Sequence, residues 1–267
     1  MQNNSFGIMQ GRLLEPPIKN DLDWFPTKTW KREFSLAKEL PIKTIELVLD
    51  RKMDINNPLR SDKGRKEVKQ EFLKNKLQPY SCCMNFIIDH PISDEDIFKD
   101  IKELIIELNK IGVKNIILPL FDASSLSLPD TLVYIKKLIE VAESNNIYLL
   151  IETDKSGKET LKYLSQLASQ NIGIVYDIGN ATYLGHDIGE DVALLEKKIK
   201  HIHIKDKNKN GKNVKLGKGI CDFNFFFQQP NIQKYSGFFT LETGRGGDPI
   251  KRAIENLDFI QELIKKK

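Results

Sequence analysis

Short apolar runs alternate with longer amphipathic stretches along almost the whole chain. Eight of the runs have the length and composition of strands, with many β-branched and aromatic residues. The predicted strands lie at Phe6–Met9, Thr44–Leu49, Gln78–Met84, Asn115–Leu120, Ile147–Ile151, Ile172–Tyr176, His201–Asp206 and Phe238–Glu242.

The stretches between these runs have the spacing of amphipathic helices. The clearest begins at Ser93-Asp94-Glu95-Asp96, where a capping residue precedes acidic first-turn residues, and it ends near Gly112. By contrast, the segment Asn208–Asp222 is rich in Lys, Gly and Asn and is predicted to be a mobile loop. Helices are predicted near Trp30–Leu40, Gly64–Lys76, Ser93–Gly112, Pro129–Ser144, Gly157–Ser169, Ile188–Lys198 and Pro249–Lys265.

Strands that alternate with helices indicate βαβ units and a parallel sheet. Eight such units over 267 residues favour a single closed (β/α)8 barrel, an α/β domain that spans residues 1–267. The structural alternative is an open doubly wound sheet. No Gly-rich dinucleotide loop follows the first strand, which argues against that alternative.

Composition gives indications about the cellular compartment of the protein but does not indicate its function. No apolar run approaches the roughly 20 residues that span a membrane, and the segment Met1–Ser5 lacks the basic and apolar regions of a secretory signal. The three cysteines are odd in number, which argues against a disulfide framework and favours a reducing cytoplasm. A net charge of +4, with lysines spread over many helices, gives no indication of a nucleic-acid partner.

Four side chains stand out at the ends of the fifth to eighth predicted strands. His203 lies in the stretch His201–Asp206, and three apolar runs end in or beside Glu152, Asp177 and Glu242. In a (β/α)8 barrel the C-terminal strand ends surround one site, so these side chains are predicted to converge. Three carboxylates and one imidazole suit a single Mn²⁺, Mg²⁺ or Co²⁺ ion, and Zn²⁺ is also compatible. Alternatively, each carboxylate caps a helix or pairs with a lysine.

These four residues and the motifs around them resemble those of the xylose isomerase-like TIM barrel superfamily. The resemblance is to its sugar and sugar-phosphate isomerase/epimerase branch. The similarity runs in the same order over almost the whole chain. It rests on the motifs Gly7-Ile8-Met9-Gln10-Gly11-Arg12-Leu13, Ile45-Glu46-Leu47, Ile151-Glu152, Asp177-Ile178-Gly179-Asn180, His201-Ile202-His203-Ile204-Lys205-Asp206, Leu216-Gly217-Lys218-Gly219 and Leu241-Glu242.

The resemblance implies that Glu152, Asp177, His203 and Glu242 are the metal ligands. It further implies that Glu152 and Glu242 exchange protons with the substrate from opposite faces, as in the ketose epimerases. The expected activity is isomerisation or epimerisation of a small sugar or sugar phosphate through a metal-stabilised enediolate. One departure concerns Asn180, because epimerases of this branch often have a titratable His at that position.

Three alternative functions are compatible with the same barrel. An inosose-type dehydratase would use the same metal and base to expel water from a polyol. A nuclease of the endonuclease IV kind would need more ligands for its metal cluster than four histidines allow. The third alternative is a barrel that binds a sugar without catalysing a reaction. The sequence leaves the metal, the exact sugar and any homo-oligomer open.

Six further residues are candidates for substrate binding because their predicted positions face the mouth of the barrel. Lys205 and Arg245 would suit an anionic group, Arg245 because glycines around it let backbone amides approach. His201 shares a face with His203 and is expected one layer deeper, as a buried support. The candidate substrate-binding residues are Gln10, Arg12, Glu46, Asn180, Lys205 and Arg245.

Overall fold

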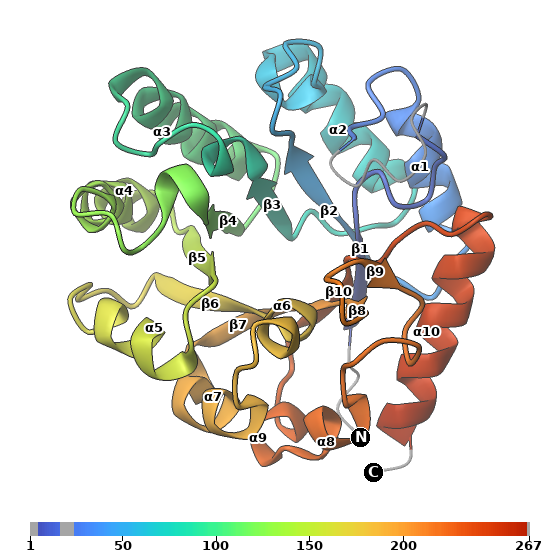
Figure 1. Ribbon diagram of the computed structural model, residues 1–267. Helices are drawn as coiled ribbons and strands as arrows, with labels where there is room; N and C mark the ends of the chain where they lie inside the picture. The colour runs from blue at the N-terminus through green and yellow to red at the C-terminus, as the bar shows by residue number, and fades with distance from the viewer. Residues whose placement is uncertain (1–4, 17–23, 266–267) are drawn as a thin grey trace.

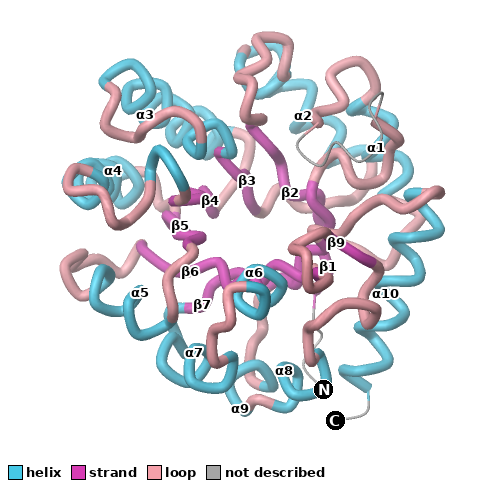
Figure 2. The backbone as a smooth tube through the Cα atoms, viewed as in Figure 1, coloured by secondary structure: helices cyan, strands magenta, loops and turns pink. Residues whose placement is uncertain are grey.

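Eight parallel strands close into one barrel in the computed structural model, and helices surround it (Figures 1 and 2). The structure describes residues 5–16 and 24–265, so residues 1–4 of the N-terminal segment considered above lie outside it. Strand β1 pairs with β10, which closes the sheet and confirms the predicted (β/α)8 barrel over the open alternative. The barrel strands are β1 (Ser5–Met9), β2 (Thr44–Leu49), β3 (Ser81–Met84), β4 (Asn115–Leu120), β5 (Tyr148–Thr153), β6 (Ile172–Asp177), β7 (Ile199–Ile204) and β10 (Phe238–Leu241).

All eight predicted strands are present, but the seventh ends earlier than predicted. Strand β7 stops at Ile204, and Asp206 begins β8 (Asp206–Lys207), which pairs antiparallel with β9 (Asn213–Val214). The segment Asn208–Asp222, predicted to be a mobile loop, consists mostly of loop and turn, but it also contributes β9 and so completes a short hairpin that was not predicted. The physical reason is Asp206, a buried carboxylate that accepts the backbone N–H groups of Gly219 at 2.8 Å and Cys221 at 3.2 Å.

The seven predicted helices are also present, although several ends differ by a few residues. Three short helices were not predicted: α6, α8 and α9. The run Phe223–Phe227 in α8 is almost wholly aromatic and lacks the alternation that indicates an amphipathic helix. The α-helices are α1 (Trp30–Ala37), α2 (Asp62–Lys74), α3 (Glu95–Lys110), α4 (Thr131–Ser144), α5 (Gly157–Leu164), α6 (Ile178–Tyr183), α7 (Ile188–Leu195), α8 (Phe223–Gln228), α9 (Pro230–Gln233) and α10 (Pro249–Lys265). Short 3-10 turns lie at Pro58–Arg60, Asn85–Ile88, Asp122–Ser124 and Glu196–Lys198. Within the described ranges, none of the helices is both long and apolar enough to cross a bilayer.

The pleat of the strands divides the core into two parts. Outward-facing residues such as Ile116 and Leu118 join the large apolar cluster that includes the helices. Inside the barrel, a small apolar cluster consists of Cys83, Ile117, Leu150 and Val175. Several other inward-facing side chains are polar, among them Glu46, His201 and His203, so the barrel interior is one place where this sequence buries charge.

Candidate metal centre

Four polar side chains converge inside the barrel at the C-terminal ends of its strands. Glu152 comes from β5, Asp177 from the end of β6, His203 from β7 and Glu242 from the residue after β10. One ligand atom of each lies within 4.8 Å of the others. Strand register explains part of this arrangement, because Asp177 and His203 are direct partners across β6 and β7. The predicted set of four is thus gathered at one point.

Two cationic groups face the carboxylates of this cluster. His203 Nδ1 lies 3.2 Å from Glu242 Oε2 and 3.6 Å from Glu152 Oε2. The ammonium of Lys205 lies 2.6 Å from Asp177 Oδ2 and 2.8 Å from Glu242 Oε2. Glu242 is the most exposed of the four side chains in the cluster, at 16%, so the site opens beside it.

Burial and these neighbours set the protonation of the carboxylates. Burial raises the pKa of Asp177 to about 6, although the nearby Lys205 ammonium acts in the opposite direction. Burial also opposes ionisation of Glu242, but the charges of Lys205, His203 and Arg12 outweigh it. The pKa of Glu242 therefore lies well below its ordinary value. Glu242 is consequently an anion throughout the neutral range.

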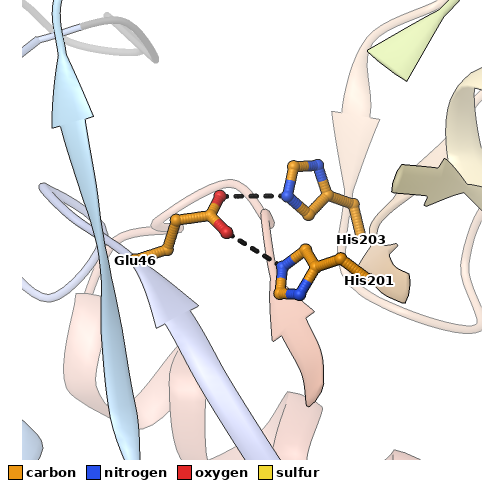
Figure 3. Close-up of side chains that lie close together, drawn as sticks. All are labelled: Glu46, His201 and His203. Carbon is orange, nitrogen blue, oxygen red and sulfur yellow. Dashed lines mark hydrogen bonds and ion pairs between the residues drawn. The ribbon is translucent and has the colours of Figure 1, made fainter. Parts of the chain in front are cut away.

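A buried carboxylate lies beneath the cluster and contacts both histidines (Figure 3). Glu46 reaches across the barrel interior from β2, and its two oxygens lie 2.9 Å from His201 Nε2 and 3.0 Å from His203 Nε2. The hydroxyl of Ser81 donates to the same carboxylate at 2.7 Å. Burial opposes ionisation of Glu46, but the imidazoles outweigh it and hold its pKa well below the usual range.

The contacts of Glu46 fix how His203 presents its ring. Its Nε2 is used by Glu46, so Nδ1 is the nitrogen that faces Glu152 and Glu242. His201 is fully buried below, as predicted from the two-residue spacing, and its ring meets that of His203 edge-on. Glu46, predicted to contact substrate, is itself fully buried, and its oxygens are engaged by side chains of the protein.

Of three other predicted residues, Asn180 and Arg12 approach carboxylates of the cluster, and Gln10 contacts β2. Asn180 donates from Nδ2 to Glu152 Oε1 at 3.2 Å, and its backbone N–H donates to Asp177 Oδ1 at 2.8 Å. Arg12 lies 3.8 Å from Glu242 Oε1. Gln10 is buried and accepts the backbone N–H of Val48 at 3.1 Å through Oε1.

Arg245 has a different position from the other five candidates. Its Nε donates to the backbone carbonyl of Gly11 at 2.6 Å, and its guanidinium lies over the ring of Trp24. It therefore joins the segment after β10 to the loop after β1. Glu33 on α1 reinforces that loop by accepting the backbone N–H groups of Gly11 and Leu13.

Sequence reasoning missed Ser81 and Glu33. Glu33 could have been found, since it lies on the buried stripe of α1 between Trp30 and Phe34, where a charged residue needs a partner. Ser81 carries no comparable signal, because its role depends on Glu46, which comes from a different strand.

The donor atoms of the cluster fit a divalent cation. Three carboxylates lie close together within the barrel, and their mutual repulsion is offset only in part by the single charge of Lys205, which contacts Asp177 and Glu242, so a divalent cation would stabilise the arrangement further. His203 Nδ1 is buried and forms no hydrogen bond with the described residues, although it faces two of the carboxylates. Three oxygens and one nitrogen are a set suited to Mg²⁺, Mn²⁺ or Co²⁺.

Comparison with known proteins agrees with this architecture. The family model described as "Xylose isomerase-like TIM barrel" matches residues 34–263. The chain belongs to this family. The matched range includes the positions of all four converging residues.

Three relatives illustrate the range within this family of barrels. A Haemophilus influenzae protein named "Putative L-ribulose-5-phosphate 3-epimerase SgbU" is 24% identical, with 89% of this chain and 92% of that protein covered. An inosose dehydratase of Mesomycoplasma hyopneumoniae is 26% identical, but the match covers only 41% of this chain and 44% of that protein. The crystal structure of D-allulose 3-epimerase from Methylomonas sp. superposes with a TM-score of 0.74 at 16% identity, covering 98% of this chain and 99% of that one.

Proposed function

We propose that this chain is a metal-dependent epimerase or isomerase of a small ketose or ketose phosphate. The observation that carries the proposal is the convergence of Glu152, Asp177, His203 and Glu242 within 4.8 Å of one another at the mouth of the barrel. Two of the relatives described above carry the names of ketose or ketose-phosphate epimerases, which supports this choice of reaction class.

The four residues would hold one divalent ion, with Mn²⁺, Mg²⁺ and Co²⁺ as the best-suited metals and Zn²⁺ as compatible. When bound, such an ion polarises a carbonyl and its neighbouring hydroxyl, so the adjacent C–H bond becomes acidic. Asp177 and His203 are fixed ligands in this proposal. Their positions are set by strand register and by the Glu46 contact to His203.

Glu242 and Glu152 are the proposed acid and base. Glu242 is held as an anion by Lys205 and Arg12, so it is ready to accept the proton from the carbon beside the carbonyl. Glu152, which is oriented by the side-chain amide of Asn180, would return a proton to the opposite face of the resulting enediolate. For the opposite epimer the two glutamates exchange roles.

The remaining candidates are assigned by their contacts. Arg12, Asn180 and Lys205 lie at the cluster, and they are proposed, together with Gln10, to bind substrate hydroxyl or carbonyl oxygens. For Glu46 we replace substrate contact with a positioning role, because its oxygens contact His201, His203 and Ser81. Arg245 is proposed to shape the mouth by holding the loop after β1.

Proton exchange with solvent tests this proposal. The purified chain should contain one divalent ion, and it should place deuterium from D₂O on the carbon beside the carbonyl of at least one ketose or ketose phosphate in a panel. Glu152→Gln should keep the fold and lower the rate of epimerisation by about 10²- to 10⁴-fold, because the acid/base group on one face of the substrate is removed.

Glu140→Gln is the matched control, since Glu140 is exposed on α4. It should epimerise the substrate as the unaltered chain does. Wild-type epimerisation in Glu152→Gln would remove Glu152 from the chemistry, and isomerisation by the unaltered chain without deuterium uptake would indicate a hydride shift instead.

A dehydratase is the second candidate, favoured by Asn180 in place of the expected His and by the partial match to inosose dehydratase. The same carboxylates would remove a proton, and the substrate would then lose a neighbouring hydroxyl as water. Loss of 18 mass units from a cyclic polyol ketone, measured by mass spectrometry, would favour this reading over epimerisation.

A further inference from the structure

The segment that follows β7 is unusually rich in lysine. Six lysines occur between residues 205 and 218, and most of them are exposed or paired. Lys215, for example, forms an ion pair with Glu255 at 2.8 Å. Lys205 is buried between two carboxylates of the proposed metal centre. Lys207, by contrast, is neither exposed nor paired with a carboxylate of the described residues. The six are Lys205, Lys207, Lys209, Lys212, Lys215 and Lys218.

The two-residue period of β7, extended beyond the strand, puts Lys207 on the same side of the chain as His203 and Lys205, and Lys207 lies close enough to Asp177, Glu242 and Glu152 for their charges to act on it. His201 lies deepest, His203 lies in the cluster, and Lys205 Nζ reaches the carboxylates from the same side. Each two-residue step advances the chain by about 7 Å in an extended backbone. The intervening Asp206 points the other way, into the hairpin, where it binds the backbone of Gly219.

Lys207 is half-buried and has no carboxylate partner among the described residues. Its ammonium lies over the ring of Tyr183 on α6, 5.1 Å from the centroid of that ring. Burial lowers the pKa of Lys207, the neighbouring Lys205 lowers it further, and the carboxylates of Asp177, Glu242 and Glu152 act in the opposite direction. Lys207 is therefore within electrostatic reach of the cluster but is not neutralised by it. A half-buried cation in this state favours the arrival of an anion.

The hairpin that carries Lys207 is well anchored. Asn208 N–H donates to the Lys212 carbonyl at 2.9 Å, and the Leu216 N–H donates to Asn256 on α10 at 3.3 Å. Gly211 packs so closely against Tyr183 that an added Cβ would lie 2.8 Å from the ring. In Figure 1, α6 and the hairpin lie inside the ring of outer helices, near the barrel strands. Lys207 is thus preorganised at the rim of the site.

We propose that Lys207 binds the phosphoryl group of the substrate, which makes a short-chain ketose phosphate the substrate class. The inference rests on the proposed function, because it places the carbonyl end of the substrate at the cluster and the phosphate two or three carbons away, toward the rim. A lysine ammonium binds phosphate as a point charge, and contact with the Tyr183 ring restricts where that charge is held.

The test compares Lys207→Gln with Lys209→Gln, an equal loss of charge at an exposed position of the same hairpin. Inorganic phosphate binding to the metal-loaded chain is measured by calorimetry. Deuterium exchange is measured with L-ribulose 5-phosphate and with L-ribulose. Lys207→Gln should weaken phosphate binding by about 10- to 100-fold, as expected when a charged hydrogen bond is lost. It should raise KM for the phosphorylated sugar alone and leave kcat nearly unchanged.

Lys209→Gln should change neither quantity, and Lys207→Arg should retain phosphate binding because it keeps the charge. Unchanged phosphate binding in Lys207→Gln overturns the inference, including the case in which phosphate binds only to the metal. Equal losses in the two Gln variants also overturn it, since they would reflect the general charge of the hairpin. If the chain exchanges no ketose or ketose phosphate of the panel, the proposed function fails, and the calorimetry still decides the role of Lys207.

Discussion

At the scale of single residues, Glu46 shows how a buried carboxylate can orient a histidine of the proposed metal site. Its contact with His203 Nε2 leaves Nδ1 directed at the carboxylates, which is the orientation a ligand needs. Partners of this kind commonly fix the tautomer and ring orientation of a metal-binding histidine. The short sequence Ile45-Glu46-Leu47 indicated only that a carboxylate lies on β2. Its target on β7 could not be known without the closed barrel.

Glu46→Gln should therefore weaken metal binding while the barrel stays folded. Glutamine keeps one acceptor oxygen. Its NH₂ group is a donor, however, and would face a hydrogen-bond donor that now bonds to an oxygen of Glu46. We expect the affinity for Mn²⁺, measured by calorimetry, to fall by about 10- to 100-fold. Ser81→Ala is the control because it removes one hydrogen bond to Glu46 but leaves both imidazole contacts, and it should have a much smaller effect. Equal Mn²⁺ affinity in Glu46→Gln and the unaltered chain would rule out the positioning role.

At the scale of elements, the strands were the part most readily predicted. Runs such as Asn115–Leu120 and Thr44–Leu49 have the predicted bounds because both are rich in Ile and Leu, as strands buried on both faces are. The helix that begins at Glu95 was marked by Asp94, whose side chain accepts the N–H groups of Asp96 and Ile97. In these cases the decisive interactions are local in sequence.

The elements that sequence reasoning missed depend on contacts between distant residues. The hairpin of β8 and β9 exists because Asp206 binds backbone groups 13 and 15 residues later, and its Lys-, Gly- and Asn-rich composition conceals this. The same limit applies to the site. Convergence of the four strand-end residues followed from the barrel, whereas the bracing of Glu46 by Ser81 required the structure.

Asp206→Ala should loosen the hairpin without opening the barrel. It leaves two backbone N–H groups without their acceptor and removes a buried carboxylate, which costs about 1–3 kcal/mol per unsatisfied group. Amide hydrogen exchange over residues 207–221 should accelerate, while the amides of β7 stay protected. Asp222→Ala, which removes the N-cap of α8 instead, should leave the 207–221 segment protected. Exchange that accelerates equally in β7 would mean that Asp206 supports the barrel itself.

At the scale of the whole molecule, closure of the barrel depends on joining the first strand to the last. Strand β1 pairs with β10 from Ser5 to Ile8, and Arg245 adds a bond from the far end of the chain to Gly11. Glu33 on α1 accepts the N–H groups of Gly11 and Leu13 at 2.8 and 3.0 Å. A buried carboxylate is therefore part of the connection between the two ends of the fold.

The protonation of Glu33 makes this connection sensitive to pH. Burial raises its pKa to about 7, against the opposing effect of the Gly11 and Leu13 amides and of two arginines. Between the unfolded pKa of about 4.5 and the folded value of about 7, the folded state holds more protons than the unfolded state. Over that range the contribution of Glu33 to the free energy of unfolding must fall as pH rises. It is constant below and above the range.

Glu33→Gln should remove this part of the pH dependence. The free energy of unfolding of the variant, relative to the unaltered chain, should rise by about 3 kcal/mol between pH 4.5 and 7.5, because one pKa unit corresponds to roughly 1.4 kcal/mol. Urea unfolding in the presence of a chelator measures the difference without contributions from metal binding, which is itself pH-dependent. Glu140→Gln, at an exposed position, should run parallel to the unaltered chain. A constant difference between Glu33→Gln and the unaltered chain would mean that Glu33 titrates alike in both states, and burial would then not govern its charge.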